Sequence, residues 1–279
     1  MKQRIITGII LLLIVVPIFL AKMLYDINDF IYFLGFVLAV IAMNEMISVK
    51  ENEKTLPFEV HLLAYLAVIY IGFAESINTI FTEVSIIEIN ILPFLLILLM
   101  LIVVFRRNFK FSDAGFILFS VLYIGLAFNT LVNYFLKTNG MYELLYVILI
   151  AIFTDTFAYF TGTFFGKHKL CPQISPKKTI EGSLGGTIIA TILVTIYVLV
   201  VDKIVLFNSS LIFIIGLTIV LSIISQFGDL AMSVIKRQYK VKDYGNIFPG
   251  HGGVLDRLDS ILFTSLAFYY INELLVTIF

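Results

Sequence analysis

Apolar runs of about 20 residues recur along the whole chain, and short polar segments separate them. A helix needs about 20 apolar residues to cross the hydrocarbon core of a bilayer, so each run predicts a membrane-spanning helix. The pattern places nine spans, at residues 5–21, 30–48, 60–76, 91–105, 112–136, 143–165, 184–201, 209–232 and 258–278. We therefore expect an all-α, polytopic integral membrane protein with about nine transmembrane helices.

The composition supports this expectation. Hydrophobic residues make up 60% of the 279 residues and charged residues only 14%, against roughly 45–50% and about 25% in soluble domains. The net charge of zero argues against a nucleic-acid partner. Because Cys171 is the single cysteine, the chain has no internal disulfide and no multi-cysteine metal site. The first apolar run resembles a signal peptide, but its length and the absence of a clear cleavage site favour a retained helix.

Basic residues predict the orientation in the membrane. If the N-terminus is cytoplasmic, Lys22, Lys137 and Lys203 fall in outer loops, and the other 16 of the 19 Lys and Arg residues fall in cytoplasmic segments. Cytoplasmic loops of membrane proteins carry such an excess of Lys and Arg. A cytoplasmic N-terminus is therefore expected, in a membrane of the bacterial plasma (inner) membrane type.

The two halves of the sequence differ in polarity. Residues 1–140 are apolar spans joined by short loops, and residues 150–279 hold nearly every Gly-rich loop and the carboxylates at membrane depth. No internal repeat is evident, which argues against a transporter built from inverted repeats. We interpret residues 1–279 as a single integral-membrane domain with a scaffold half, 1–140, and a catalytic half, 150–279.

Asp155 is expected deep in the membrane. It lies 12 residues before Lys167, or roughly 18 Å along a helix. An ionised carboxylate at that depth is costly unless it is paired or faces water. Three threonines nearby indicate a wet face, so a metal or nucleotide ligand in a water-filled cavity is favoured over a helix–helix hydrogen bond by a protonated Asp.

The loop 166–186 carries candidate phosphate ligands. Ser175, Lys177 and Lys178 offer a hydroxyl and two ammonium groups beside the start of a helix, where backbone amides also bind phosphate. Gly182, Gly185 and Gly186 would let another backbone approach the first turns of that helix. The alternative is a basic loop that only orients the protein.

A polar stripe is predicted in the span 209–232. Ser222, Ser225, Gln226 and Asp229 recur at helical spacings of three and four residues. The stripe faces either a partner helix or a site. Because Asp229 lies one to two turns before Lys236 and Arg237, we favour a ligand role for this carboxylate.

The segment 233–259 is the most polar long stretch of the chain. Clustered cations, carboxylates and bare glycine amides suit a magnesium-bound polyphosphate. Asp256 and Asp259 are three residues apart, so they share one helical face near its N-terminus, where they could bind Mg²⁺ or simply cap the helix. His251 is either a general base or a residue that orients the loop.

Four carboxylates on three helices, facing one basic cytoplasmic cavity, predict metal-dependent phosphoryl or nucleotidyl transfer to a membrane lipid. A cation transporter using Asp155 and Asp229 is the non-enzymatic alternative, but it would not need the dense Gly/Lys/Asp segment.

The segment from Ser233 to Asp259, SVIKRQYKVKDYGNIFPGHGGVLDRLD, resembles the signature of the phosphatidate cytidylyltransferase (CDP-diacylglycerol synthase) family at every position. The segments around residues 155, 175–186 and 229 are similar to further family segments in the expected order. The resemblance covers roughly residues 150–279, and the first half is similar only in being hydrophobic, so it adds no site residue.

The resemblance implies a reaction in which CTP and phosphatidate give CDP-diacylglycerol and pyrophosphate. It also implies a cytoplasm-facing active site with Mg²⁺; a second cation and a homodimer stay open. The residues expected to act are Asp229, Asp256, Asp259, Lys236 and Arg237 in catalysis, Asp229 and Asp256 on the metal, and Asp155, Ser175, Lys177, Lys178, Lys242, His251 and Arg257 on the substrates. The alternatives within this chemistry are a CTP-dependent polyprenol or lipid kinase and a cytidylyltransferase for another lipid phosphate.

Overall fold

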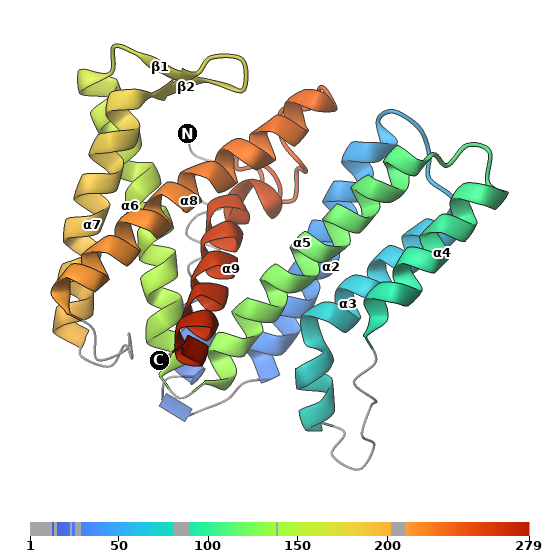
Figure 1. Ribbon diagram of the computed structural model, residues 1–279, viewed down its shortest axis with the longest axis horizontal. Coiled ribbons are helices and arrows are strands. Elements are labelled where there is room, and N and C mark those ends of the chain that lie inside the picture. Colours follow the sequence, from blue (N-terminus) through green and yellow to red (C-terminus); the bar gives the residue numbers. More distant parts are fainter. Residues whose placement is uncertain are drawn as a thin grey trace. The chain divides into compact units, whose positions relative to one another are not determined.

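The structure, a computed structural model, describes residues 13, 16–22, 24–25, 29–80, 90–137, 139–201 and 210–278. Most of these residues are helical, which confirms the expected fold class. Each predicted span from 30–48 onward overlaps one of the helices α2 to α9 (Figure 1). The first predicted span, 5–21, falls largely outside the described residues.

Five of the described helices are long and apolar enough to cross a membrane: Phe30–Glu51, Phe111–Phe135, Gly140–Phe165, Ile180–Val201 and Leu211–Gln238. Phe58–Phe73 and Ile91–Phe105 are shorter apolar helices. Helix α4, Ile91–Phe105, has 15 residues and is about 22 Å long, less than the hydrocarbon thickness of about 30 Å. The chain is thus a polytopic membrane protein.

The chain divides into two compact units. The first comprises Met1–Val132 and Val241–Arg257, and the second comprises Asn133–Lys240 and Leu258–Phe279. The signature segment 233–259 therefore has residues in both units, and its glycine-rich part belongs with the N-terminal helices.

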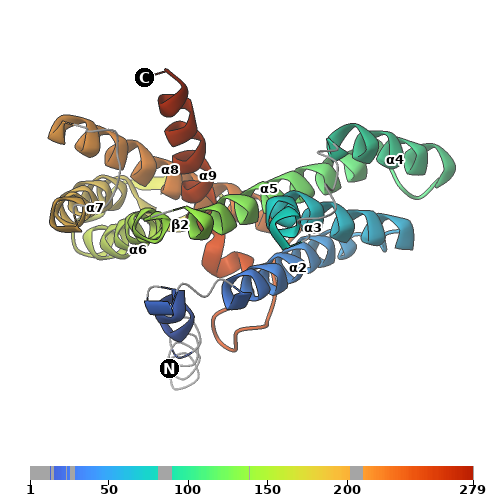
Figure 2. The same cartoon turned by 90° about the horizontal axis from the view of Figure 1, so that it is seen from below.

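The first unit contains α2 (Asp29–Glu51), α3 (Phe58–Ile80), α4 and most of α5 (Phe111–Leu136). Helices α2 and α3 run side by side (Figure 2). Fully buried small residues, Ala39 and Ala42 on α2 and Ala64 on α3, are typical of helix contacts in membranes, where small side chains let backbones approach.

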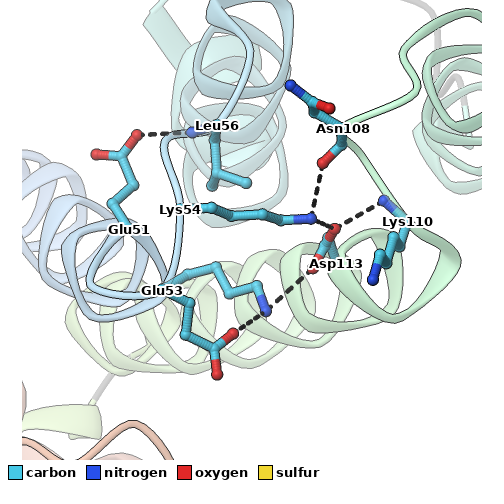
Figure 3. A network of polar contacts seen from close by, with 8 residues as sticks. Glu51, Glu53, Lys54, Leu56, Asn108, Lys110 and Asp113 are labelled. Atoms are coloured by element: carbon cyan, nitrogen blue, oxygen red, sulfur yellow. Dashed lines mark hydrogen bonds and ion pairs between the residues drawn. The ribbon is translucent and has the colours of Figure 1, made fainter.

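A buried ion-pair network joins the polar ends of these helices. Asp113, in the first turn of α5, pairs with Lys50 at 3.0 Å and also with Lys54 from the loop after α2. The backbone N–H of Lys110 donates to Asp113 at 2.7 Å, and Lys54 donates to the carbonyl of Asn108 at 2.7 Å (Figure 3). The carboxylate of Asp113 thus links the start of α5 to the end of α2, to the loop between α2 and α3 and to the loop between α4 and α5.

The second unit contains α6 (Gly140–Phe165), α7 (Ile180–Val201), α8 (Leu211–Gln238) and all but the first three residues of α9 (Leu255–Ile278). Between α6 and α7 the chain forms an antiparallel hairpin of β1 (Lys169–Cys171) and β2 (Ser175–Thr179), with Lys169 opposite Thr179 and Cys171 opposite Ser175. The hairpin lies at the end of the α6–α7 pair (Figure 1).

The hairpin is the one departure from the expected all-helical reading among the described residues. Pro172 stands in its turn and Pro176 in β2; proline removes a backbone donor and so prevents this stretch from joining a helix. Helix α7 begins at Ile180, four residues before the predicted span, because the hydroxyl of Thr179 accepts the backbone N–H of Gly182 at 3.1 Å and caps the helix.

Candidate active site

A cavity of about 560 Å³ lies within the second unit, among α6, the hairpin, α7 and α8. Its walls carry both apolar and charged side chains. The lining residues are Asp155, Ala158, Tyr159, Gly162, Thr163, Gly166, Lys169, Leu170, Lys177, Lys178, Thr179, Ser183, Gln226 and Asp229. Four predicted site residues, Asp155, Lys177, Lys178 and Asp229, are therefore brought together from separate elements.

Glycines bring α6 and α7 into backbone contact beside this cavity. A Cβ placed on Gly182 would lie 2.7 Å from the carbonyl oxygen of Ala158, and one on Gly186 would lie 2.7 Å from that of Thr154. Real Cβ atoms do not approach so closely, so only glycine fits at these two positions. The predicted close approach to the first turns of α7 is confirmed, and its partner is α6.

Lys178 and Asp229 form the central ion pair of the cavity. The ammonium of Lys178, at the end of β2, lies 2.5 Å from the carboxylate of Asp229 on α8, and both side chains are partly accessible. Ser233, one turn along α8, donates a weaker hydrogen bond of 3.4 Å to Asp229. Asp229 is thus held between a cation and a hydroxyl and points toward the cavity.

Ser260 joins two further carboxylates of the second unit. The hydroxyl of Ser260 donates to Asp155 at 3.1 Å, and its backbone N–H donates to Asp259 at 2.7 Å. Asp259 is buried and Asp155 is open to the cavity. Asp155 of α6 thus makes the helix–helix hydrogen bond that the sequence left as an alternative, and it also lines the cavity. Asp259 is the fifth residue of α9, so it is not placed as a simple N-terminal cap.

The polar stripe of α8 faces both a helix partner and the site. Ser222 exchanges a hydrogen bond of 2.8 Å with Thr154 of α6, and the amide of Gln226 donates at 2.9 Å to Thr187 of α7. These neutral contacts fix the rotation of α8. Asp229, the next residue of the stripe, is consequently directed into the cavity.

The remaining predicted basic residues of the second unit lie at the end of α8. Lys236 is buried. Arg237 is exposed and donates from Nε to the carbonyl of Ile174 in the hairpin turn at 3.3 Å. Ser175 opens β2 beside this turn. Arg237 therefore connects α8 to the hairpin in this structure.

The glycine-rich part of the signature forms a tight turn in the first unit. Gly250 and Gly252 have φ angles of +76° and +88°, which L side chains rarely adopt. The backbone N–H groups of His251 and Gly252 donate to the carbonyl of Phe248 at 2.8 and 3.1 Å. Nδ1 of His251 is buried and has no hydrogen-bond partner among the residues that the structure describes.

Asp256 holds this turn together. Its Oδ2 accepts the backbone N–H groups of Tyr244 at 2.7 Å and of Gly253 at 2.9 Å. Arg257 donates from Nε to the carbonyl of His251 at 2.8 Å, and Lys242 is exposed. Both donors to Asp256 precede α9, so these contacts fasten the turn that leads into the helix rather than the first turn of the helix.

Within the described residues, no three His, Cys, Asp or Glu side chains gather closely enough to form a ready metal site. Asp229 and Asp256 belong to different units. Their binding of a common Mg²⁺ therefore stays a prediction.

Comparison with known proteins gives a consistent result. The model of a cytidylyltransferase family matches residues 2–275. A phosphatidate cytidylyltransferase of Staphylococcus haemolyticus is 38% identical over 94% of this chain and 95% of its own length. Proteins of the same name from Staphylococcus saprophyticus and Staphylococcus epidermidis are 35% and 39% identical, with the same two coverages. The chain belongs to the cytidylyltransferase family.

Family membership extends the resemblance to nearly the whole chain, because the matched region begins at residue 2. The sequence alone predicts similarity only over residues 150–279 and no site residue in the first half. In the structure, Glu45 of α2 accepts hydrogen bonds from Val254 and Leu255 of the cytidylyltransferase signature, so the first half of the chain contacts this segment.

Two residues at the candidate site were not predicted from the sequence. Ser260 bridges two carboxylates, and Thr179 caps α7 at the wall of the cavity. Ser260 directly follows the predicted site residue Asp259, and this position is the only feature of the sequence that points to it. Glu45 did carry a signal, since it is a carboxylate within the predicted span 30–48, and a charged residue at membrane depth indicates function or a buried partner.

Proposed function

We propose that this chain is a CTP:phosphatidate cytidylyltransferase, which transfers CMP from CTP to phosphatidate and releases pyrophosphate. The observation that carries the proposal is the cavity of the second unit, which three lysines and two aspartates line within an apolar helical membrane unit. Relatives matched over 94% of the chain bear the name of this activity. An acceptor that is itself a membrane lipid explains why the charged cavity is built among apolar helices.

The reaction needs no protein nucleophile. An oxygen of the phosphatidate phosphate attacks the α-phosphorus of CTP, a new P–O bond forms, and the bond between the α-phosphorus and the bridging oxygen breaks as pyrophosphate leaves. A phosphate monoester is already anionic at neutral pH, with its second pKa near 6. The protein's task is therefore to bring two anionic groups together and to offset their charge.

Lysines of the hairpin suit this task. Lys177 is exposed at the cavity and Lys178 is paired with Asp229. Ammonium groups bind phosphates as point charges. We assign Lys177 and Lys178 to the phosphates of CTP or phosphatidate, with Lys236 and Arg237 next along α8 in supporting roles.

The carboxylates fit a hard divalent cation, because Mg²⁺ prefers oxygen ligands and is commonly held by one or two carboxylates together with substrate phosphates. Asp229 and Asp256 are the ligands we propose, and Asp155 and Asp259, which Ser260 joins to each other, would support them. When bound, Mg²⁺ would neutralise the triphosphate and stabilise the departing pyrophosphate. In this structure the cation paired with Asp229 is the ammonium of Lys178.

Labelled CTP tests the proposal directly. Purified protein in detergent with phosphatidate and Mg²⁺ should move label from the α-phosphate of CTP into the lipid fraction and release pyrophosphate. Entry of γ-label into lipid would instead identify a CTP-dependent lipid kinase. Label transfer to another lipid phosphate but not to phosphatidate would change the acceptor, and no transfer to any lipid would overturn the proposal.

A further inference from the structure

Glu45 is a buried carboxylate in a helix that the sequence assigns to the scaffold. It lies on α2, six residues before the end of that helix, and only 3% of its surface is exposed. A buried carboxylate requires compensating hydrogen bonds or a cation. The compensation comes from a segment more than 200 residues later in the sequence.

Both oxygens of Glu45 accept backbone hydrogen bonds at the start of α9. Oε1 accepts from the N–H of Val254 and Oε2 from the N–H of Leu255, each at 2.8 Å. The first N–H groups of a helix have no partner within the helix, and the helix dipole favours a negative charge there. Glu45 therefore caps α9 from another helix.

Two glycines of the signature make room for this carboxylate. A Cβ on Gly253 would lie 2.2 Å from Oε1 of Glu45, and one on Gly245 would lie 2.6 Å from the same atom. In each case the three nearest heavy atoms all belong to Glu45. Unlike Gly250 and Gly252, neither of these glycines has a positive φ angle. The space that Glu45 occupies, rather than the backbone conformation, therefore explains why they are glycines.

Asp256 completes the arrangement from the other side. It accepts the N–H groups of Tyr244 and Gly253, while Glu45 accepts those of Val254 and Leu255. Two carboxylates thus bind four backbone donors of one segment, and three of these donors are consecutive. The orientation of Asp256 and of the first turn of α9 depends on Glu45 through this shared segment.

We propose that Glu45 is a positioning residue for the transfer reaction, which holds residues 244–255 so that Asp256 and the start of α9 have the geometry needed for transfer. The proposal rests on the proposed function for its catalytic part. It makes the N-terminal half a contributor to the active site, acting through Val254 and Leu255.

The test compares Glu45→Gln with Asp113→Asn in the full-length protein in detergent. A glutamine offers one carbonyl oxygen and turns an NH₂ group toward the second backbone N–H, so one hydrogen bond is lost and a donor faces a donor. We expect kcat to fall about 10- to 100-fold, the range for losing a hydrogen bond to a charged group. Hydrogen exchange of the peptide covering residues 244–257 should accelerate, with peptides of α6 and α7 unchanged.

Asp113→Asn is the matched control, since Asp113 is a carboxylate of the same unit and is 2% exposed. It should lower the thermal stability, because Lys50 and Lys54 lose their shared partner, and leave both kcat and the exchange of residues 244–257 near wild type. Equal effects of the two variants on that peptide, or wild-type exchange in Glu45→Gln, would overturn the proposal.

A double-mutant cycle tests the same contact if Glu45→Gln does not fold. Gly253→Ala should accelerate exchange of residues 244–257, because its Cβ meets the carboxylate of Glu45. Glu45→Asp withdraws the carboxylate by one methylene, so combining it with Gly253→Ala should restore part of the loss. Additive effects would overturn the proposal. The exchange measurement needs no turnover, so it separates this inference from failure of the proposed function.

Discussion

At the residue scale, the ion pair between Lys178 and Asp229 places in direct contact the cation that we propose for phosphate and the carboxylate that we propose for Mg²⁺. Each satisfies the other in the absence of substrate, so neither charge is left uncompensated within the membrane unit. A polyphosphate entering the cavity would provide the ammonium with another anionic partner. The pair thus keeps the two groups close together at the wall of the cavity.

Replacing Asp229 tests its role. Asp229→Asn removes the negative charge opposite Lys178 and is expected to lower kcat/KM for CTP on the order of 100-fold or more, as loss of a key electrostatic contact does in other active sites. Lipid-dependent pyrophosphate release measures this. Glu273→Gln is the control, because it breaks a lysine–carboxylate pair of 2.8 Å with Lys137 that does not line the cavity. Full activity of Asp229→Asn would exclude Asp229 from the site.

Sequence alone identified many of these residues by their chemical type and spacing. Asp155, Lys177, Lys178 and Asp229 were all predicted, and all line the cavity. Glu45 could not be assigned to the signature segment, because the two are joined only by tertiary hydrogen bonds across more than 200 residues. Periodicity describes which face of a helix is polar, and it does not show which distant backbone meets that face.

At the element scale, α6 and α7 pack with glycine at the contact, and the hairpin between them carries three lysines that line the cavity, Lys169, Lys177 and Lys178. The span boundaries from the sequence agree with the helices best where apolar runs end in polar loops, as for α4 at residues 91–105. They fail at the start of α7 and the end of α8, where polar residues continue the helix beyond the apolar run. Hydropathy measures the membrane segment, whereas hydrogen bonds set the helix ends.

A pair of glycine substitutions tests the α6–α7 contact. Gly186→Ala places a Cβ 2.7 Å from the carbonyl of Thr154 and 2.8 Å from Ala158, so the helices must separate, and we expect a loss of about 1–3 kcal/mol of stability. Gly216→Ala on α8 meets nothing within 4 Å and should stabilise by about 0.5–1 kcal/mol. Denaturation in mixed micelles measures both. A loss of similar size in both variants would contradict the close contact.

At the scale of the whole molecule, the fold class followed directly from the apolar runs, and the positive-inside pattern predicts the orientation. The division of the chain into two units was harder to predict from the sequence. Residues 241–257 group with the N-terminal helices, although they lead into α9 and include its first three residues. Apolar patterning carries no information about which unit a polar loop joins.

The single cysteine tests the orientation. Cys171 lies in β1 of the hairpin, which we expect on the cytoplasmic side. A membrane-impermeant maleimide should label it in inverted vesicles and not in intact cells. Lys137→Cys in a Cys171→Ser background should give the opposite pattern, since residue 137 belongs to a predicted outer loop. Labelling of Cys171 in intact cells would reverse the proposed topology.

Close contact between α6 and α7 also bears on biogenesis. The two helices are consecutive, and their meeting residues, such as Gly162 and Gly182, are separated by only 20 positions. Contacts of such short sequence separation form quickly, and domains assemble from the N-terminus during synthesis. The hairpin of α6 and α7, which carries Asp155, Lys177 and Lys178, can accordingly form while α8 is still being translated. Asp229 would then complete the cavity when α8 packs against this hairpin.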